Sequence, residues 1–338
     1  MKCVFYFKTI NSIGGVETFF YNLAKKYDFE IYYKEANPEQ IKRLSQYVEC
    51  HKYKEPIKCD KFFCCYNYDI EVDSPVKKHI IHCDYKNVWF APFLFKDFEY
   101  IGVSQLACDS FTELTGKEAE LIYNPIYIDK PKVEKYNDGK LHLISSTRLT
   151  KEKGIDRMVK LASMLDKAGI NYVWEVYTNR KRKAIGNNVI YKDSKLDIIE
   201  DIAKAHFLVQ LSDCEAFCYS VIESLMVGTK VICTDLPVFK ELGINEDNAI
   251  ICNLDMKNVD VKQLTKYDDF TYSPPKDNWE KYLSTNKTYN PKEKIKAKAL
   301  RKIWLIDEDI HCIKGQEIEL TRQRASILEA KGYIELWY

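Results

Sequence analysis

Short apolar runs rich in β-branched and aromatic residues alternate along this chain with stretches in which apolar residues recur every three or four positions. The first run, Lys2–Phe7, is followed by Val16–Lys26, which places Phe19 and Leu23 on one helical face. Strands that alternate with helices build parallel sheets, because a parallel crossover needs a dozen or more residues and is usually helical. The pattern therefore predicts an α/β fold.

The alternation falls into two series, and a polar segment, Tyr127–Lys140, with Pro131 and Gly139, reads as the linker between them. The first series contains the predicted strands Lys2–Phe7, Glu30–Tyr33, Lys61–Tyr66, Lys78–Cys83 and Tyr100–Val103. The second contains the predicted strands Leu141–Ser146, Tyr172–Tyr177, Val189–Tyr191, Phe207–Leu211, Lys230–Cys233 and Ala249–Cys252, with helices at Ile155–Lys167, Leu196–Ala205 and Tyr219–Val227. We expect two doubly wound Rossmann-like domains, residues 1–130 and 138–290, facing across a cleft, with ligands at the carboxyl ends of the strands.

The pattern changes after Asp255, where prolines are frequent and only one short helix, near Asn278–Leu283, is expected. The last residues predict strands at Lys296–Ile306 and His311–Leu320, a helix at Thr321–Ala330 and a strand at Tyr333–Tyr338. We expect a small ββαβ appendage over residues 295–338. It either serves as a binding module or packs where a closing C-terminal helix crosses in the family resembled below.

Charge and hydropathy exclude several classes of protein. The chain has 51 Lys and Arg against 50 Asp and Glu, which argues against a strongly basic nucleic-acid binder and against a bulk electrostatic pull to a membrane. Its apolar runs, such as Trp89–Phe95, fall far short of the roughly 18 residues that a spanning helix needs. The first ten residues lack the features of a signal peptide. We therefore expect a cytoplasmic protein.

The segment Trp89–Phe95 is aromatic-rich and has two interpretations. Packing under a loop is favoured. The alternative is contact with a lipid-linked acceptor or with the inner face of a membrane, which would give a weak peripheral association. The 12 cysteines are irregularly spaced and the six histidines are scattered. This indicates free, mostly buried thiols and no metal site.

Three stretches run from a strand end into a helix and carry residues suited to binding anions or sugars. Asn11–Glu17 contains Gly14 and Gly15, which let backbone N–H groups approach an anion at a helix N-terminus. A tight turn that binds nothing is the alternative. The glycines do not follow the G-x-G-x-x-G dinucleotide pattern.

The second stretch, Ser145–Gly154, places Arg148 and Lys153 near a strand end, where two cations can neutralise a diphosphate. A solvated Lys-Glu-Lys loop is the alternative. The third, Ser212–Glu223, has Glu215 in its loop and Glu223 about one turn into the following helix. Glutamates can accept hydrogen bonds from sugar and ribose hydroxyls. Ordinary surface charge is the alternative.

In their order along the chain, these stretches resemble the retaining GT-B glycosyltransferases of family 4. The resemblance runs from about residue 11 to residue 243 and also includes Ile81-His82, Gly102-Val103-Ser104, Tyr123-Asn124-Pro125 and the run from Ile222 to Ile232. It implies an enzyme with no cofactor and no essential metal, whose substrate is a nucleotide-diphosphate sugar, with a UDP-sugar favoured.

The resemblance also implies a role for each matching residue. Arg148 and Lys153 would bind the donor diphosphate. Glu223 would bind the ribose and Glu215 the transferred sugar, with His82 beside that sugar. Gly14 and Gly15 would let the first domain approach the phosphate. Backbone contacts to sugar and phosphate would come from Phe217, Cys218, Tyr219 and Ser220.

The chain departs from the family pattern at Ala216 and Cys218, where glycine is usual, and its first domain is short. That domain usually holds the acceptor, so the acceptor stays open and is a glycan, a lipid-linked sugar or a protein. The resemblance implies a role in surface polysaccharide or glycoconjugate synthesis. The departures also motivate an alternative, a non-catalytic nucleotide- or sugar-binding protein with a degraded GT-B fold.

Overall fold

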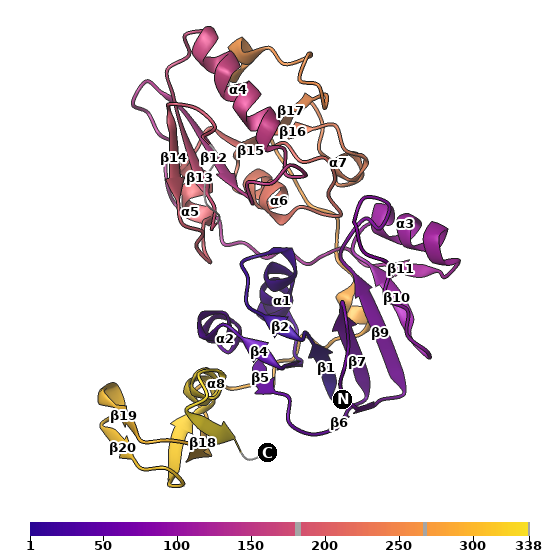
Figure 1. The fold of residues 1–338 in the computed structure, drawn as a ribbon, viewed down its shortest axis with the longest axis vertical. Helices are drawn as coiled ribbons and strands as arrows, with labels where there is room; N and C mark the ends of the chain where they lie inside the picture. Colours follow the sequence, from indigo (N-terminus) through magenta and orange to yellow (C-terminus); the bar gives the residue numbers. More distant parts are fainter. Residues whose placement is uncertain (180–183, 266–268, 337–338) are drawn as a thin grey trace.

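Two parallel sheets and a small appendage make up the protein, whose computed structural model describes residues 1–179, 184–265 and 269–336. Figure 1 shows the second sheet and its helices at the top, the first sheet below them, and the appendage at the lower left. The α/β fold with two Rossmann-like domains and a ββαβ appendage, expected from the alternation, is confirmed.

The first sheet has the strand order β11-β10-β9-β7-β1-β3-β5, and every neighbouring pair is parallel. Its strands are β1 (Cys3–Tyr6), β3 (Glu30–Tyr33), β5 (Glu49–Lys52), β7 (Lys61–Cys65), β9 (Val76–Ile81), β10 (Glu99–Gly102) and β11 (Ala119–Leu121). Two small parallel pairs flank it, β2 (Thr9–Ile10) with β4 (Glu35–Ala36) and β6 (Ile57–Lys58) with β8 (Val72–Asp73). The helices are α1 (Gly15–Lys26), α2 (Pro38–Leu44) and α3 (Gln105–Thr115).

The sequence prediction missed β5, β11, α2 and α3, although the helix caps were readable. Asn37 accepts from the Glu39 N–H at the start of α2, with Pro38 in the first turn. Ser104 accepts from the Ala107 N–H at the start of α3, and Gly116 ends that helix in the left-handed region. β5 (Glu-Cys-His-Lys) and β11 (Ala-Glu-Leu) are short and lack the β-branched residues by which strands are recognised.

The second sheet has the order β14-β13-β12-β15-β16-β17 and is also parallel throughout. Its strands are β12 (Leu141–Ser146), β13 (Tyr172–Tyr177), β14 (Val189–Lys192), β15 (Phe207–Gln210), β16 (Lys230–Thr234) and β17 (Ala249–Cys252). Its helices are α4 (Ile155–Lys167), α5 (Ile199–Lys204), α6 (Tyr219–Met226) and α7 (Pro237–Glu241). All six predicted strands are present, within one or two residues of the predicted bounds.

Each sheet has one point at which the chain reverses the direction in which it adds strands. In the first sheet this point lies between β1 and β7, and in the second between β12 and β15. Ligands of open α/β sheets bind beyond the carboxyl ends of the strands at such points. The loop with Gly14 and Gly15 follows β1 and β2, the loop with Arg148 and Lys153 follows β12, and the loop with Glu215 follows β15.

After the second sheet the chain returns to the first. Trp279, in a 3₁₀ turn at Trp279–Lys281, is fully buried, with its ring centre 5.4 Å from that of Phe19 and 5.9 Å from that of Phe63. Asp277 accepts from the Tyr27 and Tyr127 hydroxyls at 2.7 and 2.6 Å. These residues, placed by sequence at the end of the range 138–290, therefore pack in the core of the first sheet. The domain bounds themselves stay a prediction.

The appendage consists of β18 (Lys294–Ala299), β19 (Ile303–Leu305), β20 (Ile310–Cys312), β21 (Glu317–Thr321), α8 (Arg322–Ala330) and β22 (Ile334–Leu336). β18 pairs antiparallel with both β21 and β22, and this gives the expected ββαβ order. The two long strands predicted at 296–306 and 311–320 are each broken in two. The pieces β19 and β20 form a separate hairpin, with Asp309 at φ +51° in its turn.

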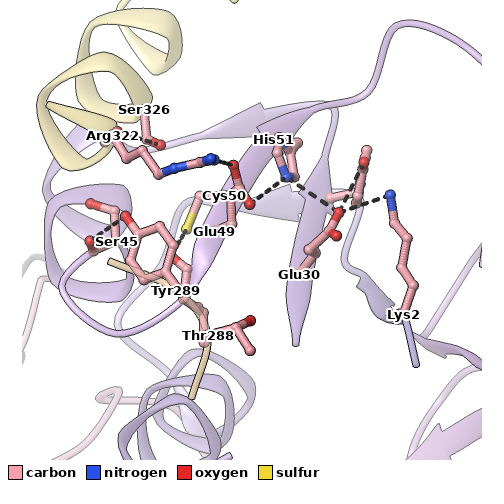
Figure 2. A network of polar contacts seen from close by, with 12 residues as sticks. Lys2, Glu30, Ser45, Glu49, Cys50, His51, Thr288, Tyr289, Arg322 and Ser326 are labelled. Atoms are coloured by element: carbon pink, nitrogen blue, oxygen red, sulfur yellow. Dashed lines mark hydrogen bonds and ion pairs between the residues drawn. The ribbon is translucent and has the colours of Figure 1, made fainter. Parts of the chain in front are cut away.

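The appendage docks on the outer edge of the first sheet, where α8 packs against α2 and the edge strand β5. Figure 2 shows the polar contacts at this joint. Arg322 forms ion pairs with Glu49 and, at 2.8 Å, with Glu293, and His51 Nε2 lies 3.4 Å from Glu30 Oε2. A cavity of about 210 Å³ lies here at the amino-terminal ends of β1 and β3. The cavity therefore lies at the amino-terminal ends of the strands, whereas the loops that carry the predicted site follow the carboxyl ends. Helix α8 covers the edge strand β5, which would otherwise be open.

Candidate active site

The two loops at the reversal point of the second sheet are locked together by backbone contacts. Gly154 has φ +77°, and a Cβ atom there would lie 1.8 Å from the Leu211 carbonyl oxygen. The Asp213 N–H donates to the Glu152 carbonyl at 2.8 Å. Arg157 Nε donates to the Leu211 carbonyl at 2.8 Å. Only glycine permits this approach at 154, so the Lys153-Gly154 pair holds the first loop against the second.

Glu215 lies at the centre of this arrangement, in the loop after β15. Its Oε1 atom accepts from Lys153 Nζ at 2.6 Å, from Ser212 Oγ at 2.7 Å and from Gln210 Nε2 at 3.1 Å. Burial alone would lower the pKa of Lys153, but the Glu215 carboxylate outweighs that effect and the pKa is raised. Lys153 is therefore a firm cation at neutral pH. Among the described residues Glu215 Oε2 has no hydrogen-bond partner, so one oxygen is anchored and the other is available.

Arg148 differs from Lys153 in being exposed. Its side chain is 59% exposed, and its nearest counter-ion is Glu152 at 3.7 Å, one turn along the same loop. A pair this exposed contributes little to stability. The guanidinium is therefore free to turn toward a ligand at little cost.

Helix α6 begins in an unusual backbone conformation. Its first flanking residue, Cys218, has φ +70° and ψ +79°, the left-handed region that favours glycine. The Cys218 Sγ atom lies 3.5 Å from Ser220 Oγ, and burial raises the pKa of the thiol to about 12. Ala216, Phe217 and Tyr219 are buried. The glycine usual at this position in the resembled family thus has a physical reason here, although this chain has cysteine.

Glu223 lies four residues into α6, and no hydrogen bond or ion pair reaches its carboxylate from the described residues. Burial raises the pKa of Glu223 to about 7, against the opposing charges of Arg43 and Lys25. Glu223 thus lacks hydrogen-bond donors among the described residues, whereas Glu215 accepts from three of them.

The loop after β1 and β2 is built around Glu17, which lies in the first turn of α1. Glu17 Oε1 accepts from the Ser12 hydroxyl at 2.7 Å and from the Ser12 N–H at 3.2 Å. A Cβ at Gly14 would lie 3.0 Å from Glu17 Oε2, whereas one at Gly15 would meet nothing within 4 Å. Gly14 thus serves the local packing, and Gly15 leaves open space at the helix N-terminus.

His82 follows β9 and lies among aromatic rings. Its ring centre is 5.0 Å from that of Phe19 and 6.4 Å from that of Tyr66, and its Nε2 atom lies 3.2 Å from Cys65 Sγ. Burial lowers the pKa of His82 to about 3, so the imidazole is neutral at physiological pH. It can exchange hydrogen bonds with hydroxyls but is not a cation there.

The aromatic segment after His82 fits its two interpretations in part. Phe90, Phe93 and Phe95 are partly buried and pack against one another, as the packing interpretation expects. Trp89, however, is 95% exposed, and Leu94 is exposed as well. No helix within the described ranges is both long and apolar enough to cross a membrane.

Contacts between the two domains bring these loops face to face. Cys214 Sγ, beside Glu215, lies 3.9 Å from the Asn87 carbonyl in the loop after His82. Glu241 in α7 accepts from the backbone N–H groups of Gln105 and Leu106 at the start of α3, at 2.5 and 3.2 Å. Arg148 acts electrostatically on Tyr66, which lies beside His82. The loop that carries Glu215 and the loop after His82 thus meet at the junction between the two domains.

Several residues at this junction were not singled out from the sequence. Gln210 and Ser212 hold Glu215, and polar side chains at the end of an otherwise apolar strand were a usable signal for them. Tyr66 ends β7 at φ +57° beside His82. The charge of Arg43 in α2 acts on the carboxyl of Glu223. No sequence signal points to Tyr66 or Arg43, because only the fold brings them to the site.

All twelve cysteines are free thiols, as the irregular spacing predicts. The described part of the chain contains no group of three or more His, Cys, Asp or Glu side chains arranged to hold a metal ion.

Comparison with known proteins gives the same picture of the fold. The family model described as glycosyl transferases group 1 matches residues 128–260. No curated protein sequence matches the chain. The solved structure of HepE from Anabaena with UDP and glucose is similar, with a TM-score of 0.56 and 13% identity, covering 75% of this chain and 86% of that one.

Two further structures agree with this. WaaG, a glycosyltransferase involved in lipopolysaccharide biosynthesis, has a TM-score of 0.56 at 14% identity, over 78% of this chain and 89% of its own. A glycosyltransferase from Rickettsia africae has a TM-score of 0.54 at 13% identity, over 75% and 84%. The chain has the GT-B fold, and the segment that carries Arg148, Lys153, Glu215 and Glu223 matches the glycosyl transferases group 1 family.

Proposed function

We propose that this protein is a retaining glycosyltransferase that moves a sugar from a nucleotide-diphosphate donor to a hydroxyl acceptor. The observation that carries the proposal is the Lys153–Glu215 pair at the reversal point of the second sheet. It joins a firm cation to a carboxylate with one free oxygen, at the place where α/β sheets bind nucleotides. A UDP-sugar is the favoured donor, and the similar HepE structures with UDP and with UDP-glucose support that choice.

The residues divide the work of the reaction between them. Arg148 and Lys153 stabilise the negative charge that develops on the leaving diphosphate, a task that a divalent cation performs in other enzymes. The free Oε2 of Glu215 accepts from a hydroxyl of the transferred sugar, and Glu223 accepts from the ribose. His82, neutral and enclosed by aromatic rings, exchanges a hydrogen bond with the sugar.

The transfer step follows a front-face course. The acceptor oxygen forms a bond to the anomeric carbon on the face that the diphosphate leaves, while the bond from that carbon to the diphosphate oxygen breaks. The proton of the acceptor hydroxyl passes to the departing phosphate. No protein nucleophile takes part, and the configuration of the sugar is retained.

We further propose that the acceptor is a glycan, a lipid-linked sugar or a protein, in the synthesis of a surface polysaccharide or glycoconjugate. The similarity to WaaG supports this setting. The exposed Trp89, in the loop that follows His82, supports weak contact with a lipid-linked acceptor or with the inner face of a membrane. We propose that the protein is cytoplasmic and associates with that face only peripherally.

A non-catalytic nucleotide- or sugar-binding protein is the second candidate. One observation favours it, the side chain at Cys218 in a left-handed conformation. A Cβ at this position takes up room where a phosphate would approach the start of α6.

The two candidates are separated by incubating the protein with a panel of nucleotide sugars in EDTA and measuring the nucleoside diphosphate released. A parallel thermal-shift screen reports binding alone. We expect UDP to raise the melting temperature without metal, and UDP to be released from at least one UDP-sugar, with the release lost in Glu215→Gln. Binding without release for every donor, with and without acceptor sugars, would favour the non-catalytic candidate. A melting shift that appears only with Mg²⁺ or Mn²⁺ would contradict the metal-free site.

A further inference from the structure

Two opposite charges from different domains have no ion-pair partner among the described residues. One is Glu223 on α6. The other is Arg43 on α2, whose guanidinium carbon lies 3.6 Å from the centre of the Tyr21 ring, a cation–π contact. Neither side chain is exposed. A charge withdrawn from water without a partner is costly, so each calls for a compensating group.

Neighbours of these two charges, one from each domain, contact the same short segment of chain, residues 125–127. From the first domain, Lys25 Nζ on α1 donates to the Tyr127 carbonyl at 2.8 Å. From the second domain, the Tyr219 hydroxyl at the start of α6 donates to the Pro125 carbonyl at 3.2 Å. Helices α1 and α2 pack together, and Arg43 and Lys25 both lie on the Tyr21 ring. Lys25, which shares the Tyr21 ring with Arg43, and Tyr219, one helical turn before Glu223, therefore lie at the same segment between the domains.

The electrostatics agree with this placement. Burial lowers the pKa of Arg43, and the charges that oppose this effect include Glu223 and Asp197. Burial raises the pKa of Glu223 to about 7, and Arg43 is the largest opposing influence. The other charged groups that act on Glu223 are Lys25, which also lowers its pKa, and Asp197, which raises it. Without Arg43, a carboxyl this buried would be protonated over more of the physiological range.

We propose that Arg43 is a positioning residue for the nucleotide site, which keeps Glu223 in the carboxylate form that accepts hydrogen bonds from the ribose hydroxyls. The inference rests on the proposed function and adds to it. The first domain then supplies the positive charge of Arg43 to the nucleotide-binding part of the site, in addition to contacts with the acceptor. A carboxylate offers acceptors to both hydroxyls of a ribose, whereas a carboxylic acid carries a proton on one oxygen. Hydrogen bonds to a charged acceptor are also the stronger ones.

The test is the pH dependence of UDP-glucose affinity, measured by calorimetry between pH 5.5 and 8.5. The diphosphate diester of UDP-glucose does not titrate in this range, so a pH-dependent affinity reports on the protein. In the wild type the affinity should rise as the pH rises through the Glu223 pKa. In Arg43→Gln the midpoint of the rise in UDP-glucose affinity should move to higher pH. The affinity at pH 7 should fall by about threefold to tenfold and should recover at higher pH. Arg43→Lys should restore most of the wild-type profile.

Two controls make the test specific. Lys42→Gln removes the same charge from the neighbouring position on α2, where the side chain is exposed, and should leave the profile unchanged. In a Glu223→Gln background the pH dependence should vanish, and Arg43→Gln should add little further loss.

Some outcomes would overturn the inference. These are an unchanged midpoint in Arg43→Gln, an equal effect of Lys42→Gln, or full additivity of the Arg43 and Glu223 changes. A pH-independent loss that Arg43→Lys does not restore would show a merely structural role and also overturn it. If the wild type binds neither UDP nor UDP-glucose, the proposed function fails. If the wild type binds and the Arg43 variants behave as their controls, only the inference fails.

Discussion

Glu215 and Glu223 belong to one continuous stretch of sequence, yet they occupy opposite environments. Glu215 is held by Lys153, Ser212 and Gln210, all from its own domain. Glu223 receives no hydrogen bond from the described residues. The charge that most lowers its pKa, against the effect of burial, is that of Arg43 in the other domain. The environment of Glu215 is therefore built by the second domain alone, whereas the charges around Glu223 come from both domains. In the function that we propose, these are the sugar-diphosphate side and the ribose side of the site.

The largest loss of stability should come from disrupting the contact between the loop at Gly154 and the loop that carries Glu215. Gly154→Ala places a Cβ against the Leu211 carbonyl in a left-handed conformation, and we expect a loss of at least about 3 kcal/mol in the free energy of unfolding. Gly15→Ala, with open space around its Cβ, should change stability by less than about 1 kcal/mol. Urea denaturation of both variants measures this. Equal losses would show that the strand-end loops are not locked as described.

Removing either cation should weaken UDP binding, but only one removal should cost stability. Lys153→Ala leaves the partly buried Glu215 without its counter-ion, and we expect a loss of about 2–3 kcal/mol. Arg148→Ala removes an exposed side chain and should cost less than about 0.5 kcal/mol.

Chemical denaturation gives the two stabilities, and calorimetry with UDP and with uridine gives the ligand effects. Each variant should lose more affinity for UDP than for uridine, because we propose that both cations bind the diphosphate. Equal losses for the two ligands would place Arg148 and Lys153 elsewhere.

Because no hydrogen bond reaches the Glu223 carboxylate from the described residues, Glu223 should lower the free energy of unfolding of the ligand-free protein in a pH-dependent way. Its folded pKa of about 7 lies above the ordinary value of 4.5, so the carboxyl favours the folded state below pH 4.5. That contribution is lost as the pH rises toward 7. Glu223→Gln should therefore gain about 1–3 kcal/mol over the wild type between pH 5 and pH 8.

Denaturation at the two pH values tests the Glu223 prediction, with the exposed Glu39→Gln as the control. A constant difference between Glu223→Gln and the wild type across this range would show that Glu223 is already paired or solvated.

The smallest effect concerns the start of α6. Cys218→Gly relieves a left-handed conformation, but it also makes the unfolded chain more flexible. We expect a change between zero and about 1 kcal/mol in favour of glycine. Thermal unfolding measures the shift, with Cys214→Gly as a control at a position without a positive φ. A clear destabilisation by Cys218→Gly would show that the thiol packs rather than strains the turn.

The sequence was most informative where neighbouring residues build the structure. The strand and loop before Gly154 and the loop from Ser212 to Glu223 could be placed, because an apolar run, a turn and an amphipathic helix follow one another within a few residues. Arg43, Tyr66 and Trp279 could not be placed at their sites. Each reaches its neighbours through the tertiary fold, and no local pattern encodes that.

Partial failures have similar causes. The two long strands expected in the appendage are interrupted at residues 300–302 and 313–316, where the chain enters and leaves the β19–β20 hairpin. The aromatic run Trp89–Phe95 has no periodicity that separates the exposed Trp89 from its packed neighbours.

The central claim, that Glu215 serves the transferred sugar and Glu223 the nucleotide, is tested most directly by measuring UDP affinity in EDTA for Glu215→Gln and Glu223→Gln. UDP lacks the sugar, so we predict that Glu215→Gln keeps its affinity within about twofold while turnover falls by about tenfold to a hundredfold. Glu223→Gln should lose about tenfold in UDP affinity at pH 8, where its carboxylate is ionised. Wild-type UDP affinity in Glu223→Gln, or wild-type turnover in Glu215→Gln, would contradict the account.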